Sequence, residues 1–505
     1  MARTPQEAYD ELLRRVRETA LLGSCAGVLH WDQETYMPRK GASHRANQLS
    51  LLAGMTHEKF TDPAIGELLA AAEGSDVVAD PLSDAAVNVR ELRRSYDRAT
   101  KLPRDLVEEL ARVTSLAHNV WIEARKKSDF ALFRPWLEQV VALKVREADC
   151  YGHSGSRYDA LLEDYEPGAT TVWLRGVLGP LRNELVKLLD AIKGSGRQPD
   201  VALLARSYPL AQQEIFGRVA AAAIGFDFEA GRLDTVAHPF CSGFGPGDTR
   251  LTTRYNEHDF GDAFFSIIHE TGHGLYDQGL PTEHWGTPRG DCVSLGVHES
   301  QSRMWENLVA RSHGFWRHFF PIARQFFPAA LGDVSLDAFH FAINDVRPSF
   351  IRVDADEVTY NLHIVLRFEL EQALLSGELP VADLPGAWNE KFARLFGITP
   401  PDDAQGCLQD THWSGGGIGY FPTYTLGNLN AAQLFAAARR AIPDLEEQFA
   451  RGAFADLLAW LRTSIHQQGM HHRAPKLIES VTGKPLSHEP LLAHLWGKYT
   501  PLYGL

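Results

Sequence analysis

The chain has few cysteines, no long apolar run and no surplus of positive charge. Its five cysteines are an odd number, lie far apart and form no C-x-x-C pair. This argues against a disulfide framework or a cysteine zinc site and favours a reducing, cytoplasmic location. No window holds about 18 uninterrupted apolar residues, so we expect no transmembrane helix and no membrane partner. Fifty basic against 64 acidic residues give a net charge of -14, which argues against a nucleic-acid partner.

The remaining composition is that of an ordinary globular protein. Of 505 residues, 44% are hydrophobic and 23% are charged, which is enough for a large core. No repeat or low-complexity tract divides the chain. We therefore expect a single domain over 1–505, with a helical half over 1–200 and a half over 201–505 that carries the functional site. The linker-like stretch 193–200 joins two helices.

Helical periodicity dominates the sequence. Apolar residues at spacings of three and four predict a helix from Pro103 to Asp129, and the stretches 84–100, 133–147 and 172–192 are similar. The predicted fold class is mostly α.

A small β-ribbon is expected in the second half, where threonine, valine and aromatic residues increase. Thr235 to Phe240 and Arg250 to Tyr255 are predicted to pair as a hairpin around the turn at 243–248.

One predicted helix, over 261–278, carries the most informative motif. His269-Glu270-Thr271-Gly272-His273 fits H-E-x-x-H, which places two histidines on one helix face with a glutamate between them. This is a common way to hold a divalent metal beside a general base. The pattern can also arise by chance in a chain with 21 histidines. Gly272 and Gly274 indicate a close backbone approach at this helix.

A catalytic metal site needs a third protein ligand and an open position for water. Glu299, in a second helix predicted from His298 to Arg311, is the natural candidate. Its alternative interpretation is a surface pair with Arg303, four residues on. Glu270 would not bind the metal but would take a proton from the attacking water and pass it to the leaving amine. The motif therefore indicates metal-assisted hydrolysis.

Several short motifs lie outside the H-E-x-x-H helix. They are His238-Pro239-Phe240, Asp248-Thr249-Arg250-Leu251-Thr252, His298-Glu299-Ser300-Gln301, Ile351-Arg352-Val353-Asp354-Ala355-Asp356, Gly406-Cys407-Leu408-Gln409-Asp410-Thr411-His412-Trp413, and Trp31-Asp32 followed by Thr35, Met37 and Pro38. With these motifs, nearly the whole chain resembles the carboxypeptidase Taq family of metallocarboxypeptidases, and no motif position departs from the family pattern.

The resemblance implies a mostly helical fold with a long, deep active-site cleft. It implies a metal bound by His269, His273 and Glu299, with Glu270 as the catalytic acid and base. Members of the family remove single C-terminal amino acids with broad side-chain tolerance, proline excepted, use zinc or cobalt and commonly form homodimers. We therefore expect a cytoplasmic, homodimeric enzyme that binds one divalent ion, zinc before cobalt, and acts on peptides with a free C-terminus.

Cleavage at the C-terminus requires recognition of a carboxylate, for which an arginine is the best partner. Arg352 is the first choice because it precedes a helix that is apolar on most sides and would hold it rigidly. Arg250 and Arg254 are second choices. A structural salt bridge is the alternative for each of the three.

Two tyrosines and two histidines complete the candidates. Tyr420 and Tyr424 share a face after the glycine run at 414–419, and His412 precedes that run, which lacks the G-K-[ST] ending of a phosphate loop. Each could donate to the oxyanion that develops at the attacked carbonyl. Tyr424 is also a substrate-binding candidate. His238 is a candidate for substrate contact beside the ribbon, and packing or an ordinary hydrogen bond is the alternative for all four.

Two rival functions stay open from the residues alone. An endo-oligopeptidase or dipeptidase needs the same metal and base but no carboxylate anchor. A peptide-binding protein with a structural metal site belongs to a different class. Glu270 argues against the second rival, since a structural site has no use for a base.

Overall fold

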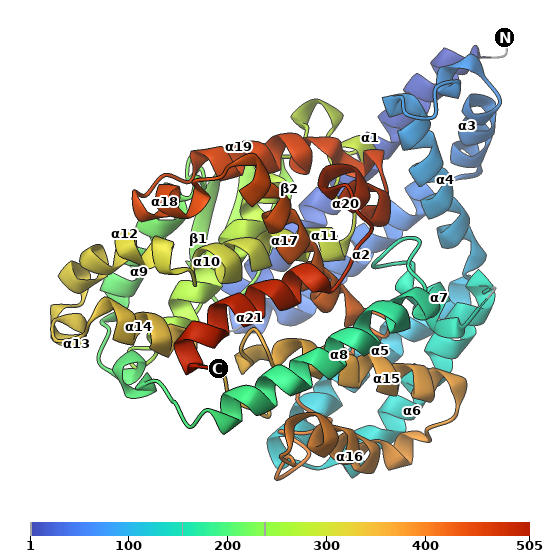
Figure 1. Ribbon diagram of the computed structural model, residues 1–505. Helices are drawn as coiled ribbons and strands as arrows, with labels where there is room; N and C mark the ends of the chain where they lie inside the picture. Colours follow the sequence, from blue (N-terminus) through green and yellow to red (C-terminus); the bar gives the residue numbers. More distant parts are fainter. Residues whose placement is uncertain (1–2, 154, 237–238) are drawn as a thin grey trace.

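Helices make up most of the computed structural model, which describes residues 3–153, 155–236 and 239–505 (Figure 1). The predicted mostly α fold is confirmed. Among the described residues, no helix is long and apolar enough to cross a membrane. The long active-site cleft implied by the family resemblance stays a prediction.

The first part of the chain is entirely helical in its described regular elements. The stretches expected to be helical over 84–100, 103–129, 133–147 and 172–192 are α4, α5, α6 and α8. Side-chain oxygens of Ser83, Asp129 and Thr170 cap the backbone at the starts of α4, α6 and α8. The helices are α1 (Pro5–Thr35), α2 (Ala42–Phe60), α3 (Pro63–Glu73), α4 (Asp84–Lys101), α5 (Arg104–Lys127), α6 (Phe130–Tyr151), α7 (Arg157–Leu162) and α8 (Thr171–Gly194).

The second part adds more helices and one sheet. The helices are α9 (Leu210–Ala223), α10 (Phe260–Asp277), α11 (Leu295–Arg303), α12 (His313–Phe326), α13 (Pro328–Leu331), α14 (Leu336–Ile343), α15 (Tyr360–Ser376), α16 (Leu384–Phe396), α17 (Pro422–Ala441), α18 (Leu445–Ala450), α19 (Ala455–Ser464), α20 (Ala474–Thr482) and α21 (Glu489–Tyr503). The helix expected from His298 begins earlier, at Leu295, and changes at Met304 into a π-helical segment, Met304–Val309.

The sheet has three strands in the order β1-β3-β2: β1 (Gly231–Thr235), β2 (Cys241–Gly245) and β3 (Asp248–Thr253). β2 and β3 form an antiparallel hairpin, whereas β1 lies parallel to β3. The second arm of the predicted ribbon overlaps β3. The first arm is wrong, because Thr235 is the last residue of β1, Val236, Pro239 and Phe240 lie outside the strands, and the expected turn contains a strand. Residues 237–238 of this arm lie outside the described residues.

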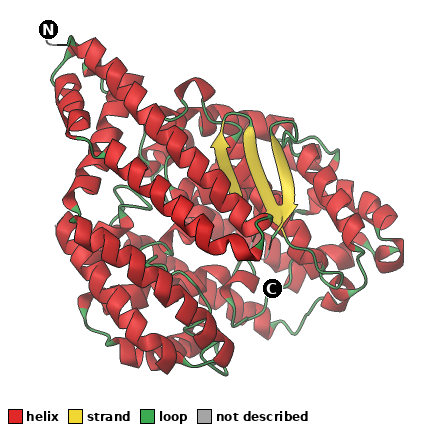
Figure 2. Ribbon diagram, turned by 180° about the vertical axis from the view of Figure 1, so that it is seen from behind, coloured by secondary structure: helices red, strands yellow, loops and turns green. Residues whose placement is uncertain are grey.

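The reason for this error lies in the composition of β2. Its sequence, Cys-Ser-Gly-Phe-Gly, is poor in strand-forming residues. It becomes a strand because the buried β3, in which Leu251 is fully buried, needs a hydrogen-bonding partner on that side. Figure 2 shows the sheet from behind with a long helix running beside it. This contact involves α1, where the Ser24 hydroxyl donates to the Phe244 carbonyl at 2.5 Å.

The apolar core consists of three clusters of buried side chains. One joins α1, α3 and α4, a second joins α5 to α8 with α15, α16 and α21, and a third joins α9 to α14 with α18 to α20. α17 contributes to both of the larger clusters, through Leu426 and Leu429 to one and Leu434 and Phe435 to the other. The second cluster therefore draws on both halves of the chain. The single domain over 1–505 stays a prediction.

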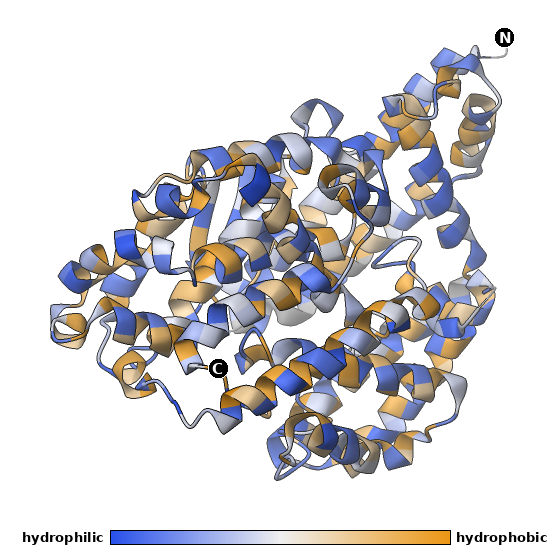
Figure 3. Cartoon of the chain, viewed as in Figure 1, coloured by the Kyte–Doolittle hydropathy of each residue, from blue (hydrophilic) through white to orange (hydrophobic). Residues whose placement is uncertain are grey.

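The helices are amphipathic, and Figure 3 shows hydrophilic and hydrophobic residues alternating along α8. α1, α3 and α4 extend away from the rest of the molecule toward the N-terminus, and the C-terminus lies beside α21 (Figure 1).

The central position of α17 matters for function, because α11 packs directly against it.

Candidate metal centre

One face of α10 is apolar and packs into the core, and another face carries polar residues. Asp259 caps its first turn by accepting from the Asp262 backbone. The predicted apolar face is confirmed, since Phe264, Ile267, Ile268, Thr271 and Leu275 are all buried.

Two glycines let α11 lie very close to its neighbours. A Cβ added at Gly272 of α10 would lie 2.5 Å from the Ser302 Cα, and one added at Gly427 of α17 would lie 2.4 Å from the Glu299 Cγ. The close approach predicted at Gly272 is therefore confirmed. Any larger side chain at either position would push α11, and Glu299 with it, away from the histidines.

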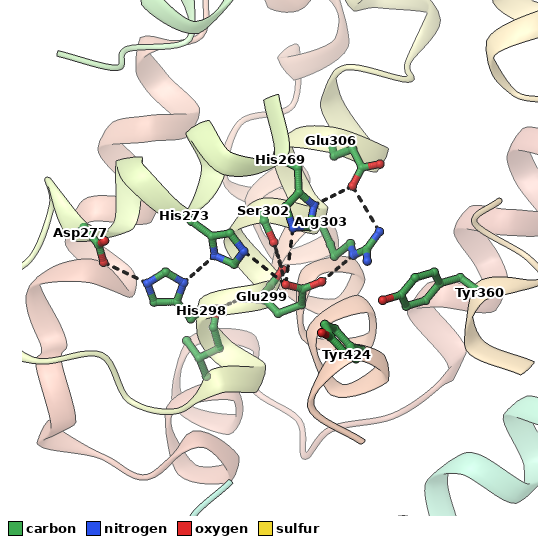
Figure 4. Close-up of polar contacts among 12 residues, drawn as sticks. His269, His273, Asp277, His298, Glu299, Ser302, Arg303, Glu306, Tyr360 and Tyr424 are labelled. Carbon is green, nitrogen blue, oxygen red and sulfur yellow. Dashed lines mark hydrogen bonds and ion pairs between the residues drawn. The ribbon is translucent and has the colours of Figure 1, made fainter. Parts of the chain in front are cut away.

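His269, His273 and Glu299 point toward one another in Figure 4. The Glu299 Oε2 lies 3.7 Å from the His269 Nε2 and 3.3 Å from the His273 Nε2. The three ligand atoms all lie within 4.8 Å of one another. A tetrahedral ion with bonds of about 2.0–2.1 Å keeps its ligand atoms about 3.3 Å apart. The spacing and the donor set therefore fit a divalent metal ion.

Charged partners behind the ligands hold them in place. The His269 Nδ1 lies 2.9 Å from the Glu306 Oε2. The Arg303 guanidinium donates to Glu299 at 2.7 Å and to Glu306 at 3.3 Å, so it braces both carboxylates. The pair of Glu299 and Arg303 suggested by their spacing exists, but it is buried rather than at the surface. Such outer partners orient ligands and tune their basicity.

His273 is oriented by a second histidine. Its Nδ1 lies 2.5 Å from the His298 Nδ1, and the His298 Nε2 lies 2.9 Å from the Asp277 Oδ1. When the His298 Nε2–H donates to Asp277, its Nδ1 accepts from the His273 Nδ1–H. The lone pair of the His273 Nε2 then faces Glu299, as metal ligation requires.

The electrostatics of His273 and Glu299 favour their metal-binding forms, whereas the pKa of His269 is raised, because the carboxylates of Glu299 and Glu306 outweigh its burial. Burial lowers the pKa of His273 to about 4, which keeps the imidazole neutral. Burial alone would raise the pKa of Glu299, but Arg303 and the two histidines hold it well below its ordinary value. Glu299 is thus a carboxylate near neutral pH.

Glu270 differs from its neighbours in having no hydrogen-bond or ion-pair partner among the described residues. It is 7% exposed, and within the described part of the chain its carboxylate accepts no hydrogen bond. Burial raises its pKa to about 7, with the Glu299 and Glu306 charges acting in the same direction. A carboxyl group with these properties can both take and give a proton near neutral pH.

Arg352 is buried where two sequence motifs meet. Its Nε and Nη2 donate to the Asp410 Oδ1 at 3.0 and 2.9 Å, and its Nη1 donates to the Tyr360 hydroxyl at 2.9 Å. Asp410 also pairs with the fully buried Arg367. The structural salt bridge considered for Arg352 is therefore present. A guanidinium has five N–H donors, so these contacts leave two free.

The predicted aromatic candidates gather next to Arg352. The Tyr424 hydroxyl lies 3.2 Å from the His412 Nε2, and the Tyr420 ring centroid lies 5.4 Å from that of Tyr424. The charge of Glu299 contributes to raising the pKa of both tyrosines, after the larger effect of burial. Burial also lowers the pKa of His412 to about 4.

The other candidates lie elsewhere. Arg250 donates to Asp248 at 2.8 Å and stacks over the Trp31 ring, and Arg254 pairs with Asp262 at 2.8 Å. His238 lies outside the described residues. Arg250 and His238 stay predictions for substrate binding.

The sequence of the whole chain matches one known family. The model of the carboxypeptidase Taq (M32) metallopeptidase family matches residues 11–499. The chain belongs to this family. A divalent metal ion is implied by membership of the carboxypeptidase Taq family.

Known relatives cover the full length of the chain. Thermostable carboxypeptidase 1 of Thermus thermophilus is 53% identical, with 99% of this chain and 100% of the relative covered. Carboxypeptidase 1 of Bacillus subtilis is 36% identical, with 99% of each covered. The crystal structure of the M32 carboxypeptidase from Deinococcus radiodurans superposes with a TM-score of 0.95 at 41% identity, covering 99% of this chain and 100% of that one. The protein is a metallocarboxypeptidase, a peptide hydrolase.

Sequence reasoning about this carboxypeptidase Taq family member missed three residues of the site. Asp277 follows His273 by four residues on the same helix face, so spacing alone could have found it. Glu306 reaches His269 from the π-helical segment, which no local pattern predicts. Tyr360 reaches Arg352 only through the packing of α15, and the sequence carries no signal for it.

Proposed function

We propose that this metallocarboxypeptidase removes single C-terminal amino acids from peptides, with Glu270 as general base and then general acid. The observation that carries the proposal is the position of Glu270 next to three convergent ligand atoms. The Glu299 Oε2 lies 3.3 and 3.7 Å from the two histidine nitrogens. Glu270 follows His269 directly in the chain and is free of hydrogen-bond partners in the described structure.

His269, His273 and Glu299 would hold one divalent ion, which supplies a Lewis acid that acidifies water and polarises a carbonyl. Glu270, which is buried and directly follows the ligand His269, takes the proton of the attacking water. It then gives this proton to the leaving amine. Glu306, Arg303 and the pair His298 and Asp277 keep the three ligands oriented throughout.

Arg352 is proposed as the anchor for the terminal carboxylate. Asp410 and Tyr360 fix its guanidinium, and two N–H groups are left for a ligand. Tyr420 and His412 are proposed as oxyanion donors, and Tyr424 as a substrate-binding residue. Broad side-chain tolerance is proposed from the family resemblance.

Zinc is proposed as the metal, because two imidazoles and a carboxylate are common zinc ligands, with cobalt as the alternative. We also propose a homodimer from the family resemblance. A cytoplasmic location is supported by the five cysteines, all free.

A pair of peptides tests the proposal. A defined peptide with a free C-terminus and the same peptide amidated are incubated with the metal-loaded enzyme, and the products are followed by mass spectrometry. We expect a ladder of single-residue losses from the free peptide and at least tenfold slower cleavage of the amide. Equal rates, or internal fragments, would favour the endo-oligopeptidase alternative.

A further inference from the structure

Tyr360, the first residue of α15, lies between the metal ligands and Arg352. It is 4% exposed. The Arg303 guanidinium lies 4.2 Å from the centroid of its ring, and the Tyr424 ring meets it edge-on at 6.1 Å. Figure 4 shows the ring with its hydroxyl turned toward the ligands.

The hydroxyl of Tyr360 has an unused hydrogen. Its oxygen accepts from the Arg352 Nη1 at 2.9 Å, and among the described residues no acceptor receives its own O–H. Tyr424 differs, because its hydroxyl is shared with the His412 Nε2. A buried donor that lacks an acceptor is unfavourable. A donor of this kind, turned toward a metal centre, indicates that a ligand receives it.

The geometry at Arg352 limits which part of a substrate the hydroxyl can reach. The two hydrogens of Nη1 diverge by about 120°, and Tyr360 occupies one of them. A carboxylate oxygen at the other hydrogen would lie about 5 Å from the Tyr360 oxygen, too far for a hydrogen bond. In a peptide, the scissile carbonyl oxygen lies roughly 4–6 Å from the terminal carboxylate oxygens. The scissile carbonyl is therefore the group that the hydroxyl can reach.

We propose that Tyr360 is a catalytic residue that donates a hydrogen bond to the oxyanion developing on the scissile carbonyl. Tyr360 keeps its proton throughout, so no further acid or base is needed. Arg352 strengthens the donation, because a phenol whose oxygen accepts from a cation is a better donor. The proposal rests on the hydrolysis proposed above.

Tyr360→Phe tests this role because it removes only the hydroxyl and leaves the ring stacked on Arg303. We expect kcat to fall by about 10²–10³-fold, the loss typical of one oxyanion donor, with KM and the affinity for zinc within threefold of wild type. A phosphonate analogue of the tetrahedral intermediate should bind more weakly by about the same factor as the loss in kcat/KM. A product amino acid should bind unchanged.

Tyr503→Phe is the matched control, since it removes a buried hydroxyl that accepts from the backbone of Val346, which is not a residue of the site. It should leave kcat unchanged. Three results for Tyr360→Phe would overturn the proposal: kcat within threefold of wild type, a raised KM at constant kcat, or weakened zinc binding. The last two would place its effect in Arg352 or Arg303 instead. If the wild type cleaved free and amidated peptides equally, the C-terminal anchor would fail, whereas the kcat of Tyr360→Phe would still report on the oxyanion.

Discussion

This protein has two neighbouring buried polar clusters, and their charged groups are arranged differently. The ligand cluster comprises His269, His273, Glu299, Arg303, Glu306, His298 and Asp277. The anchor cluster comprises Arg352, Asp410, Arg367, Tyr360, His412 and Tyr424. In the ligand cluster, three ligand atoms face a common point and their charged partners lie behind them. In the anchor cluster, Asp410 faces two arginines and offsets one of their two positive charges.

The first arrangement of charges suits the binding of a cation, and the second stabilises the folded chain. Ligand atoms that converge on one point repel or leave lone pairs unsatisfied until a cation joins them, so their geometry must be imposed by partners. Asp410 is the counter-charge that the two buried arginines share, so it stabilises the folded chain, and one edge of Arg352 is left for a substrate. Damage to the first cluster should therefore weaken metal binding or catalysis, and loss of Asp410 from the second should weaken folding.

Glu270→Gln should have the largest effect. The amide cannot accept the proton of water, so kcat should fall by about 10³–10⁴-fold. The metal content, measured by elemental analysis, should equal that of wild type because Glu270 ligates nothing. Turnover near the wild-type rate would exclude Glu270 as the base.

Asp410→Asn should weaken folding and leave metal binding unchanged. It leaves Arg367, which is fully buried, and Arg352 without a counter-charge. Breaking a buried pair in this way costs about 3–5 kcal/mol of unfolding free energy. Denaturant unfolding would measure the loss, and the zinc affinity of the folded protein should not change. Asp190→Asn, at an exposed residue of α8, is the control, and equal stability of the two variants would contradict the comparison.

The pH dependence of stability should reveal a carboxyl group beside the anchor cluster. Glu371 accepts from Trp413 and Gly419, and burial raises its pKa from 4.5 to about 7. A folded-state pKa above the unfolded value stabilises below about pH 4.5, and this contribution is lost as the pH rises to about 7. Wild type should therefore lose roughly 3 kcal/mol more than Glu371→Gln between pH 4.5 and 8. Glu378→Gln, at an exposed position, should behave like wild type, and parallel curves for all three proteins would refute this assignment.

Glu306→Ala should give the smallest effect, confined to the ligand cluster. Without the carboxylate at 2.9 Å, the His269 ring loses its orientation. Loss of such a partner typically weakens metal binding by about 10–100-fold. Competition with a chromophoric chelator would measure the affinity, and excess zinc should restore most of kcat. Glu306→Gln keeps an amide oxygen for the His269 N–H and should lose less.

The sequence predicted the helices and the ligand motif because both depend on local spacing. The i, i+4 placement of His269 and His273 follows from helix geometry alone, and Gly272 indicated the close approach of another backbone. Glu299 was identified by the need for a third ligand. The same spacing rule predicts the ion pair between Glu299 and Arg303. It does not predict whether the pair is exposed or buried, and in the structure it is buried.

The remaining features depend on contacts between distant segments. β1 pairs in parallel with β3 across an intervening connection and the strand β2, whereas a local pattern favours a hairpin. Arg352 meets Asp410, 58 residues further along the chain, so spacing could not tell an anchor from a salt bridge. Tyr360 reaches Arg352, and Glu306 reaches His269, only when α15, α11 and the π-helical segment pack together.

The π-helical segment Met304–Val309 makes the active site sensitive to the number of residues as well as to their identity. A π turn holds about one residue more than an α turn. Deleting a single residue there would let α11 continue as a regular α-helix, which keeps the register beyond the segment but changes the directions of the side chains inside it. Glu306 would then no longer face His269, although every side chain named in the ligand cluster could still be present. An insertion or deletion scan across this segment would therefore reveal a constraint that substitutions alone do not detect.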